Sequence, residues 1–471
     1  MRKIMFLLLW LPLFSFSGPG AETFLPVGHC SFGGLTQFTA HSTKMLEQVS
    51  PNYKAYPLTL SVALALEPQL AGFDFSQPAA IYFYRPVQPH RQTPLWCLCV
   101  RRTEAKPQPQ LTIAKKQLHV KYFARIALIS DNRKLLETLT APPDLPEKMA
   151  HDVQIELLPA AATFITPTNL QQLYELAGKK MSRHPAAPGV EILTPISAHL
   201  RRLLGQTEKT VISLDILSDQ IQLQWQWFPV SGSPLKSFLE RQNRNSRLLP
   251  QPESGKNFAL SFNLLLSPPE HRVLAALLSL GPKTGNDTTA QDFSRLLHGI
   301  FANSNGLGRL AVTAASQRQP GQFCVEFRCS NSAAIAPIRQ IMATTPHFKS
   351  PAPNLYLLYS LPTAADGETT GKLFGALKNE MVYLIGGKIT AAAAMKTIAA
   401  AASSWPHLKQ PGMIFGRAEI DGQPAWTVAV TCQPELRAEV KLLPPLWRKL
   451  LPPHQKEEKH RVKLSLPLPI K

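Results

Sequence analysis

Two consecutive segments decide the fold class: TVISLDIL (Thr210–Leu217) and QIQLQWQWF (Gln220–Phe228). The second segment alternates apolar residues with glutamines, which is the pattern of a strand with one buried face. If Ser218 and Asp219 form a two-residue hairpin loop, the apolar faces of the two strands coincide. The pairs in that register are Ile216 with Ile221, Leu214 with Leu223, and Ile212 with Trp225. We therefore expect an antiparallel hairpin whose tryptophans pack in the core, the alternative being a platform for a sugar or another ligand.

Further strand and helix signals lie on both sides of this hairpin. Apolar runs predict strands at residues 81–84, 95–100, 153–158, 258–266, 310–315, 323–327, 355–359 and 381–385. Capping signals predict helices that begin after Asp131, Thr166, Thr194, Ser233 and Ser267, and apolar periodicity predicts others at 293–301, 333–342 and 390–402. Asp421-Gly422 predicts a second hairpin, between 413–420 and 426–432. The chain is thus expected to be an α+β protein with antiparallel or mixed sheets and flanking helices.

An internal echo predicts two related modules. RIALISDNRKLLETL (residues 125–139) and EMVYLIGGKITAAAAMKTI (residues 380–398) each run from an apolar strand through a short break into a helix. Ordinary alternation of strands and helices would also produce this echo. The division falls between Ser182–Gly189 and Pro250–Gly255, so the expected modules are residues 22–185 and 186–435. Residues 436–471 are expected to form a basic C-terminal tail or an edge strand.

The first 21 residues predict a signal peptide. Arg2 and Lys3 precede an apolar run from Ile4 to Phe16, and small residues follow it. The run is shorter than the roughly 20 residues that span a bilayer, so an uncleaved anchor is the less favoured interpretation. We expect an exported protein, periplasmic or at the cell surface, with no transmembrane helix in the mature chain.

The formal net charge of +19 bears on possible partners. Most basic residues occur as scattered pairs, and only residues 241–247 and 437–471 look locally concentrated, so nucleic acid is an unfavoured partner. In an exported protein the charge favours an anionic envelope polymer, an anionic membrane surface or another envelope protein, or it serves solubility alone.

The cysteines are even in number and widely spaced, which allows disulfides in an exported chain. They are Cys30, Cys97, Cys99, Cys324, Cys329 and Cys432. Cys97 and Cys99 share a strand face and point in parallel, whereas Cys324 and Cys329 lie on opposite faces. Any disulfide is therefore expected between distant segments, with Cys30 as a candidate, while other cysteines are buried as small apolar residues.

No catalytic, cofactor or metal motif is complete. DGETTGKL (Asp366–Leu373) lacks a glycine at Asp366 and a hydroxyl at Leu373, so no nucleotide is expected. Asn305–Gly308 is expected to be a turn before a strand. His29-Cys30 is the least implausible nucleophilic pair, but it needs a base from elsewhere. The histidines have no metal-ligand spacing, so we predict no metal and no cofactor, and catalytic residues stay unknown.

The run LAGFDFSQPAAIYFY (Leu70–Tyr84) resembles a pattern of uncharacterised exported bacterial proteins. In these a glycine-x-aspartate-x-serine-x-proline turn precedes an apolar strand, here with Gly72, Asp74, Ser76 and Pro78. The resemblance covers this stretch and the RIALISDN step, and it implies an exported α+β protein without a known activity. The four residues are also ordinary turn formers.

The sequence leaves two classes of function. The leading hypothesis is a non-enzymatic binding or assembly protein of the bacterial envelope, because export and a full-sized core coincide with incomplete catalytic motifs. The alternative is an exported hydrolase whose site is assembled from residues far apart in the sequence.

Overall fold

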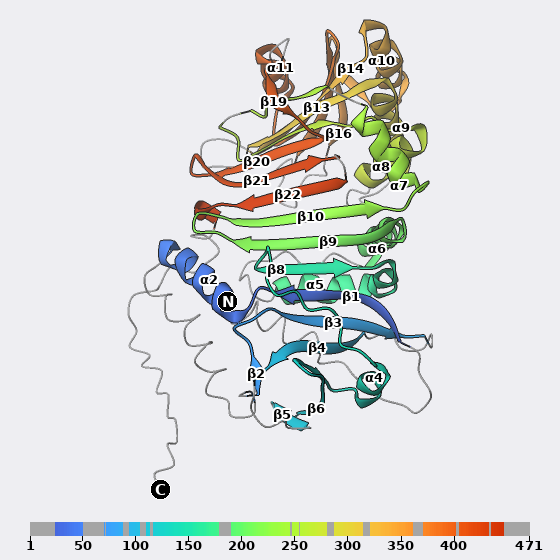
Figure 1. The fold of residues 1–471 in the computed structure, drawn as a ribbon. Helices are drawn as coiled ribbons and strands as arrows, with labels where there is room; N and C mark the ends of the chain where they lie inside the picture. Colours follow the sequence, from blue (N-terminus) through green and yellow to red (C-terminus); the bar gives the residue numbers. More distant parts are fainter. Residues whose placement is uncertain are drawn as a thin grey trace, which may run out of the picture.

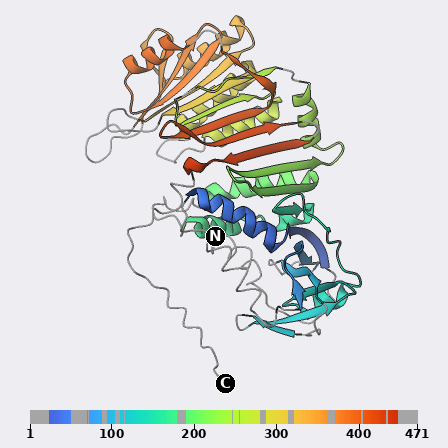
Figure 2. The same cartoon turned by 60° about the vertical axis from the view of Figure 1, so that its left-hand side comes forward.

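The computed structural model describes residues 24–49, 70, 72–87, 94–103, 110–113, 116–178, 190–244, 247–253, 255–279, 287–313, 321–360, 371–401, 405–432 and 435–446. The expected signal peptide and residues 447–471 lie outside these ranges, as do residues 366–370 of the DGETTGKL segment. Figure 1 shows one long, twisted sheet that runs through the molecule, and Figure 2 shows helices packed along it.

The main sheet has 20 strands in the described part of the chain, and its neighbouring strands pair antiparallel. Its first strands are β1 (Phe24–Phe32), β2 (Phe73–Asp74), β3 (Ala79–Pro86), β4 (Leu95–Arg102), β5 (Gln110–Ile113), β6 (Lys116–Tyr122), β7 (Ile126–Ser130), β8 (Val153–Leu157), β9 (Thr207–Ile216) and β10 (Ile221–Pro229). The others are β12 (Phe258–Asn263), β13 (Ser304–Thr313), β14 (Gln322–Cys329), β15 (Lys349–Ala352), β16 (Leu355–Ser360), β17 (Lys372–Lys378), β18 (Met381–Gly387), β20 (Ile414–Ile420), β21 (Gln423–Thr431) and β22 (Leu436–Leu442). A separate small ladder joins β11 (Leu248–Pro250) to β19 (His407–Pro411).

The described helices flank this sheet. They are α2 (Leu35–Val49), α4 (Arg133–Thr138), η3 (Pro159–Phe164), α5 (Pro167–Gly178), α6 (Val190–Gly205), α7 (Pro234–Asn243), α8 (Pro268–Ser279), α9 (Asp287–Asn303), η4 (Ser332–Ala334), α10 (Ile335–Thr344) and α11 (Ala391–Ala400). With its large antiparallel sheet the protein belongs to the mixed α+β class, as the sequence predicts.

Both hairpins expected from the sequence are present. β9 and β10 pair with Ile216 opposite Ile221, Leu214 opposite Leu223, and Ile212 opposite Trp225, which confirms the predicted register. β20 and β21 are joined through Asp421 and Gly422, whose φ angles of 53° and 76° are those of a hairpin turn with two left-handed residues. Alternation of apolar and polar residues thus predicts the first pairing correctly, and the Asp-Gly turn predicts the second.

Helix starts follow the sequence in some places and depart from it in others. Thr166 and Ser233 cap α5 and α7 as expected, each accepting a hydrogen bond from a backbone N–H in the first turn. Asn132, and not Asp131, caps α4, because its side chain accepts from the N–H of Leu135 at 2.9 Å. Thr194-Pro195 does not start a helix: α6 is already helical from Val190, and Leu193, upstream of the proline, is buried.

The strands follow the same spatial order in the two halves of the sheet. In residues 24–229 the order is β5-β6-β7-β4-β3-β1-β8-β9-β10. In residues 258–442 it is β16-β17-β18-β14-β13-β12-β20-β21-β22. The sets also correspond in chain order, with α4 after β7 and α11 after β18. The RIALISDN and EMVYLIGG segments therefore occupy matching places.

The two halves meet through their last strands. β10 pairs with β22 in antiparallel register, with Trp225 opposite Ala438 at the centre. β22 also pairs with β21, so residues 436–442 form an interior strand; the expected tail or edge strand at 436–471 is wrong for this part. Because matching strands pair antiparallel, the junction has the geometry of a local two-fold axis near Trp225 and Ala438.

A partly buried lysine closes the matching helix in each half. Lys121 on β6 donates to the carbonyls of Leu136 and Leu139 at the end of α4, at 2.9 and 2.8 Å. Lys378 on β17 donates to the carbonyl of Ile398 at the end of α11, at 2.9 Å. In each case a cation satisfies carbonyl groups that lack partners within the helix and meets the negative end of the helix dipole.

We expect Lys121→Met and Lys378→Met each to lower the free energy of unfolding by about 1–2 kcal/mol, because each removes charge-assisted hydrogen bonds to helix-terminal carbonyls. Urea unfolding followed by circular dichroism measures the change. Lys134→Met, at an exposed position on α4, is the control, with an expected change within about 0.5 kcal/mol. A large effect at only one of Lys121 and Lys378 would contradict matching roles.

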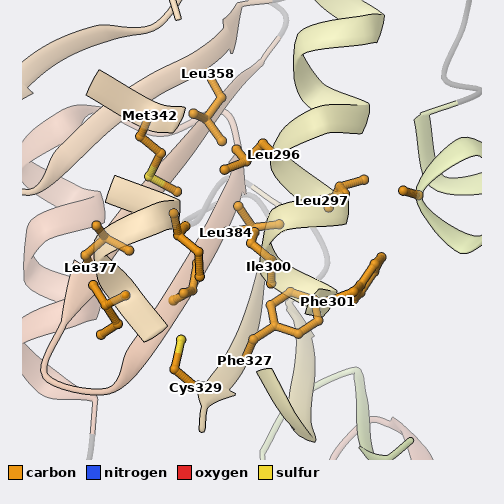
Figure 3. Packing of buried hydrophobic residues seen from close by; sticks show 14 of the residues in the cluster. Leu296, Leu297, Ile300, Phe301, Phe327, Cys329, Met342, Leu358, Leu377 and Leu384 are labelled. Carbon is orange, nitrogen blue, oxygen red and sulfur yellow. The ribbon is translucent and has the colours of Figure 1, made fainter. Parts of the chain in front are cut away.

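The largest apolar core lies on one face of the second half. Figure 3 shows side chains of α9 and α10 packed against β14, β16, β17 and β18. Leu296, Ile300 and Met342 are fully buried in this cluster. On the opposite face, α11 contributes Ala394 and Ile398 to a second cluster with Tyr383 and Ile385. Strand β18 is thus buried on both sides, which holds α11 and its surroundings in a fixed place.

Candidate ligand pocket

A pocket of about 700 Å³ opens between α11 and the neighbouring strands of the second half. Its sheet side is formed by β13 and β14, and its helical side by residues from the start of α11 to its end. The lining residues are Glu253, Lys256, Ala311, Thr313, Gln322, Cys324, Glu326, Lys388, Ile389, Thr390, Ala393, Lys396, Thr397, Ala400 and Ala401. The volume is within the usual range for small-molecule sites, and the lining mixes charged, hydroxyl and small apolar side chains.

A buried ion pair lies at the sheet side of this pocket, and of its two members only Glu326 lines the pocket. Arg309 on β13 and Glu326 on β14 are directly opposite each other, and both are less than a tenth exposed. The guanidinium Nε and Nη2 donate to Glu326 Oε2 at 3.0 and 2.7 Å. A buried carboxylate held by two donors of one guanidinium is strongly oriented.

Trp405 completes this ion pair. Its indole Nε1 donates to Glu326 Oε2 at 2.9 Å, and its ring lies 5.0 Å from the Arg309 guanidinium carbon. The indole therefore contacts both charges at once, through a hydrogen bond and a cation–π contact. Glu253 Oε1 lies 3.5 Å from Arg309 Nη2, and Lys256 Nζ lies 3.5 Å from Glu253 Oε2.

The first half has no charge at the matching position. Matching positions are found by following the strand pairing outward from Lys121 and Lys378. In the first half, Lys121 is opposite Leu128 on β7, and Leu128 is opposite Cys99 on β4. In the second half, Lys378 is opposite Met381 on β18, and Met381 is opposite Arg328 on β14. Two residues earlier on the same strands are Cys97 and Glu326, whose neighbours on β3 and β13 are Tyr82 and Arg309. A neutral tyrosine–cysteine pair thus matches the arginine–glutamate pair, so this strand arrangement forms without buried charges at this position.

Cys324 lines the pocket but is poorly suited to act as a nucleophile. Burial raises the pKa of its thiol to about 12, with the nearby carboxylates of Glu326 and Glu253 acting in the same direction. Tyr383 is opposite Glu326 on β18, and burial together with that carboxylate raises the pKa of its phenol to about 12. Both groups are protonated at neutral pH, so they can donate hydrogen bonds and do not add negative charge.

His29 and Cys30, the pair singled out in the sequence, do not face each other. They are neighbours on β1, so their side chains point to opposite faces of the sheet. Cys30 is 2% exposed, and burial raises the pKa of its thiol to about 12. His29 stacks on Tyr82 with ring centroids 5.1 Å apart, and burial lowers its pKa. The structure therefore contradicts a thiolate nucleophile at Cys30.

All six cysteines lie in the described part of the chain, and all are free thiols. The expected disulfide of Cys30 is not formed; Cys30, Cys97, Cys99, Cys329 and Cys432 are buried instead. Cys97 and Cys99 belong to one apolar cluster, which confirms that they share a face. Cys324 and Cys329 pack against different clusters, which confirms their opposite faces.

The sequence predicts that the tryptophans of β10 pack in the core, and this prediction is wrong. Trp225 is 38% exposed, and its ring is parallel to that of Trp227 with centroids 5.7 Å apart. Their strand is at the middle of the sheet, where every residue of β10 keeps some exposure to solvent. Asn305–Gly308 also departs from the expected turn: it belongs to β13, with an irregular register around Gly306.

A second polar cluster fastens α2 to the sheet in the first half. Asp152 is 1% exposed and accepts hydrogen bonds from His41 at 2.7 Å, Gln37 at 3.1 Å and the N–H of Ile216 at 2.8 Å. His151 contacts Asp215 at 2.9 Å beside it. Every named group in this cluster has a partner within the protein, so its contacts explain the position of α2.

We expect the protein to lose stability in acid because His271 on α8 is buried. Burial lowers its pKa, and His298, with ring centroids 6.0 Å apart, lowers it further, while Glu270 acts in the opposite direction. Because the unfolded chain binds a proton at a higher pH than the folded chain, stability is retained above the ordinary histidine pKa of about 6.5 and falls as the pH decreases below it. His271 contributes a slope of at most about 1.4 kcal/mol per pH unit.

His271→Gln should reduce this pH dependence, because glutamine carries no titrating proton in this range. Urea unfolding at pH 5.5 and 7.5 measures it for the wild-type protein and the variant. Equal pH dependence in the two proteins would contradict the assignment.

The sequence patterns did not predict the contacts among Arg309, Glu326 and Trp405. Its members are 17 and 79 residues apart in the chain, so no local motif contains them. One signal was available: Arg309 and Glu326 each interrupt an otherwise apolar strand run.

No described helix combines the length and apolar character needed to cross a membrane. Comparison of the chain with protein-family models, with curated proteins and with solved structures finds no match.

Proposed function

We propose that this chain is an exported, non-enzymatic binding protein of the bacterial envelope that holds its ligand in the pocket beside α11. The observation that carries the proposal is a buried ion pair placed at a cavity of small-molecule size, where the matching position of the first half is neutral. Burying two charges is unfavourable unless they are well paired, and the fold itself does not require them. A role in ligand binding explains why they are present.

The proposal includes two related modules. Three observations support it: the same strand order in both halves, a lysine that closes the matching helix in each, and pairing of the two final strands about a local two-fold axis. We place the division between β10 and α7, within residues 229–234, because β9 and β10 continue the strand order of the first half. This lies inside the window that the sequence suggested, but after residue 185.

Export and binding are tested separately. Fractionation of the native host, followed by N-terminal sequencing of the protein, should recover a shortened chain in the periplasmic or surface fraction. Recovery of the intact chain in the cytosol would contradict export. Binding is tested by incubating the purified protein with an extract of envelope polymers and small molecules and identifying what co-elutes; a co-eluting compound that still binds after Arg309 and Glu326 are replaced would contradict this pocket as its site.

A further inference from the structure

The charges around the pocket define the chemistry of its ligand, if the proposed binding function holds. We propose that the pocket beside α11 binds an organic anion through a phosphate or carboxylate group placed among Lys256, Lys388 and Lys396. All three lysines line the pocket, together with the carboxylates of Glu253 and Glu326. Arg309 does not line the pocket but is paired with Glu326, and with it four positive charges stand against two negative ones, a formal excess of +2.

The carboxylates are largely neutralised within the protein. Glu326 Oε2 accepts from Arg309 and Trp405, and Glu253 lies 3.5 Å from both Lys256 and Arg309. Lys388 and Lys396 lie on exposed positions at the start and middle of the helical wall. An incoming anion would therefore meet the ammonium groups of Lys388, just before α11, and Lys396, on α11, and the carboxylates that oppose it are already paired.

The orientation of α11 adds to this positive potential. Its first turn lies in the pocket wall, where Thr390 accepts from the N–H of Ala393 and the adjacent lining residues are Lys388 and Ile389. The N-terminus of a helix carries a partial positive charge, whereas the C-terminus of α11 is occupied by Lys378. The positive end of the helix and the three lysines thus act on the same volume.

The rest of the pocket indicates a ligand larger than an inorganic ion. A volume of about 700 Å³ far exceeds one phosphate group, and apolar and hydroxyl side chains share the wall. Ala393, Lys396, Thr397 and Ala400 face the pocket from successive turns of α11 and offer small apolar contacts beside hydroxyl donors. These features fit a hydroxylated organic body that carries one anionic group.

Three probes that share a hydroxylated six-carbon body separate the sources of the charge: glucose 6-phosphate, gluconate and neutral glucose. Isothermal titration calorimetry with the full-length mature protein measures their affinities at low salt. We expect at least one of the two anions to bind at least about tenfold more tightly than glucose, since charge-assisted hydrogen bonds supply the difference. Tighter binding of glucose 6-phosphate would indicate a phosphate site, and tighter binding of gluconate would indicate a carboxylate site. Equal affinity of all three probes, or binding of neither anion, would overturn the inference.

Variants locate the site. Lys396→Met and Lys256→Met should each weaken binding of the anion about fivefold or more, while Lys134→Met, on the matching helix α4, leaves it unchanged. Lys396 is exposed, so its variant is expected to fold, and unfolding curves check this. Loss of affinity that is equal in Lys396→Met and Lys134→Met would contradict the site. If neither anion binds but the co-elution experiment finds another ligand in this pocket, the inference of an anionic ligand is wrong and the proposed binding function stands.

Discussion

Glu326→Ala is expected to lower the free energy of unfolding by about 3–5 kcal/mol, because it leaves the Arg309 guanidinium buried without its partner. The side chains of Arg309 and Glu326 are only 9% and 6% exposed, so solvent screens the orphaned charge poorly. Trp405 also loses the acceptor for its indole N–H, which adds to the loss. Chemical unfolding of the wild-type protein and the variant, monitored by tryptophan fluorescence and circular dichroism, measures the difference.

The double variant Arg309→Met/Glu326→Leu separates charge from packing. It removes both charges and keeps most of the side-chain volume, so it should be more stable than Glu326→Ala. A double variant less stable than the single one would show that the ion pair is needed by the fold, which contradicts the interpretation drawn from Tyr82 and Cys97.

Val440→Pro should lower stability by at least about 3 kcal/mol, because β22 joins the two halves. Val440 is opposite Leu223 on β10 and Val428 on β21, so its strand has a neighbour on both sides. Proline removes a ladder hydrogen bond and leaves a carbonyl of a neighbouring strand without its donor, and its ring does not fit a central strand. Thermal and urea unfolding measure the effect.

Val440→Ala is the matched control, since it shortens the same side chain and keeps the backbone N–H. Val440 is only partly buried, so the control should lose about 1 kcal/mol or less. If proline and alanine have similar effects at this position, β22 does not have the interior place that its pairing with β10 and β21 gives it.

Strand pairing could be predicted where alternation was strict. In β10 the glutamines and apolar residues define the two faces, so only one register with β9 matches them. The Asp421-Gly422 turn was equally clear, because both residues adopt the left-handed conformation that this loop requires. The echo at residues 125–139 and 380–398 pointed to matching places in the sheet because a short strand-to-helix connection leaves few arrangements.

The site could not be predicted in the same way. Arg309, Glu326 and Trp405 meet only because β13 and β14 are adjacent and the segment after α11 returns to them. The central position of β22 was not predicted for a related reason. No pattern in residues 436–442 indicates that they pair with β10, which lies more than 200 residues away in the chain. Trp225 was placed in the core because alternation identifies the apolar face of a strand but does not tell whether anything covers it.

We propose that two matching halves are joined through β10 and β22 about an axis between Trp225 and Ala438. Trp225→Cys combined with Ala438→Cys tests it, since directly opposite residues have the spacing that a disulfide needs. Mass spectrometry of the oxidised, digested protein should find the two introduced cysteines linked, whereas Gln226→Cys with Ala438→Cys, which point to opposite faces, should stay unlinked. Linkage of the second pair, or absence of linkage in the first, would contradict the account.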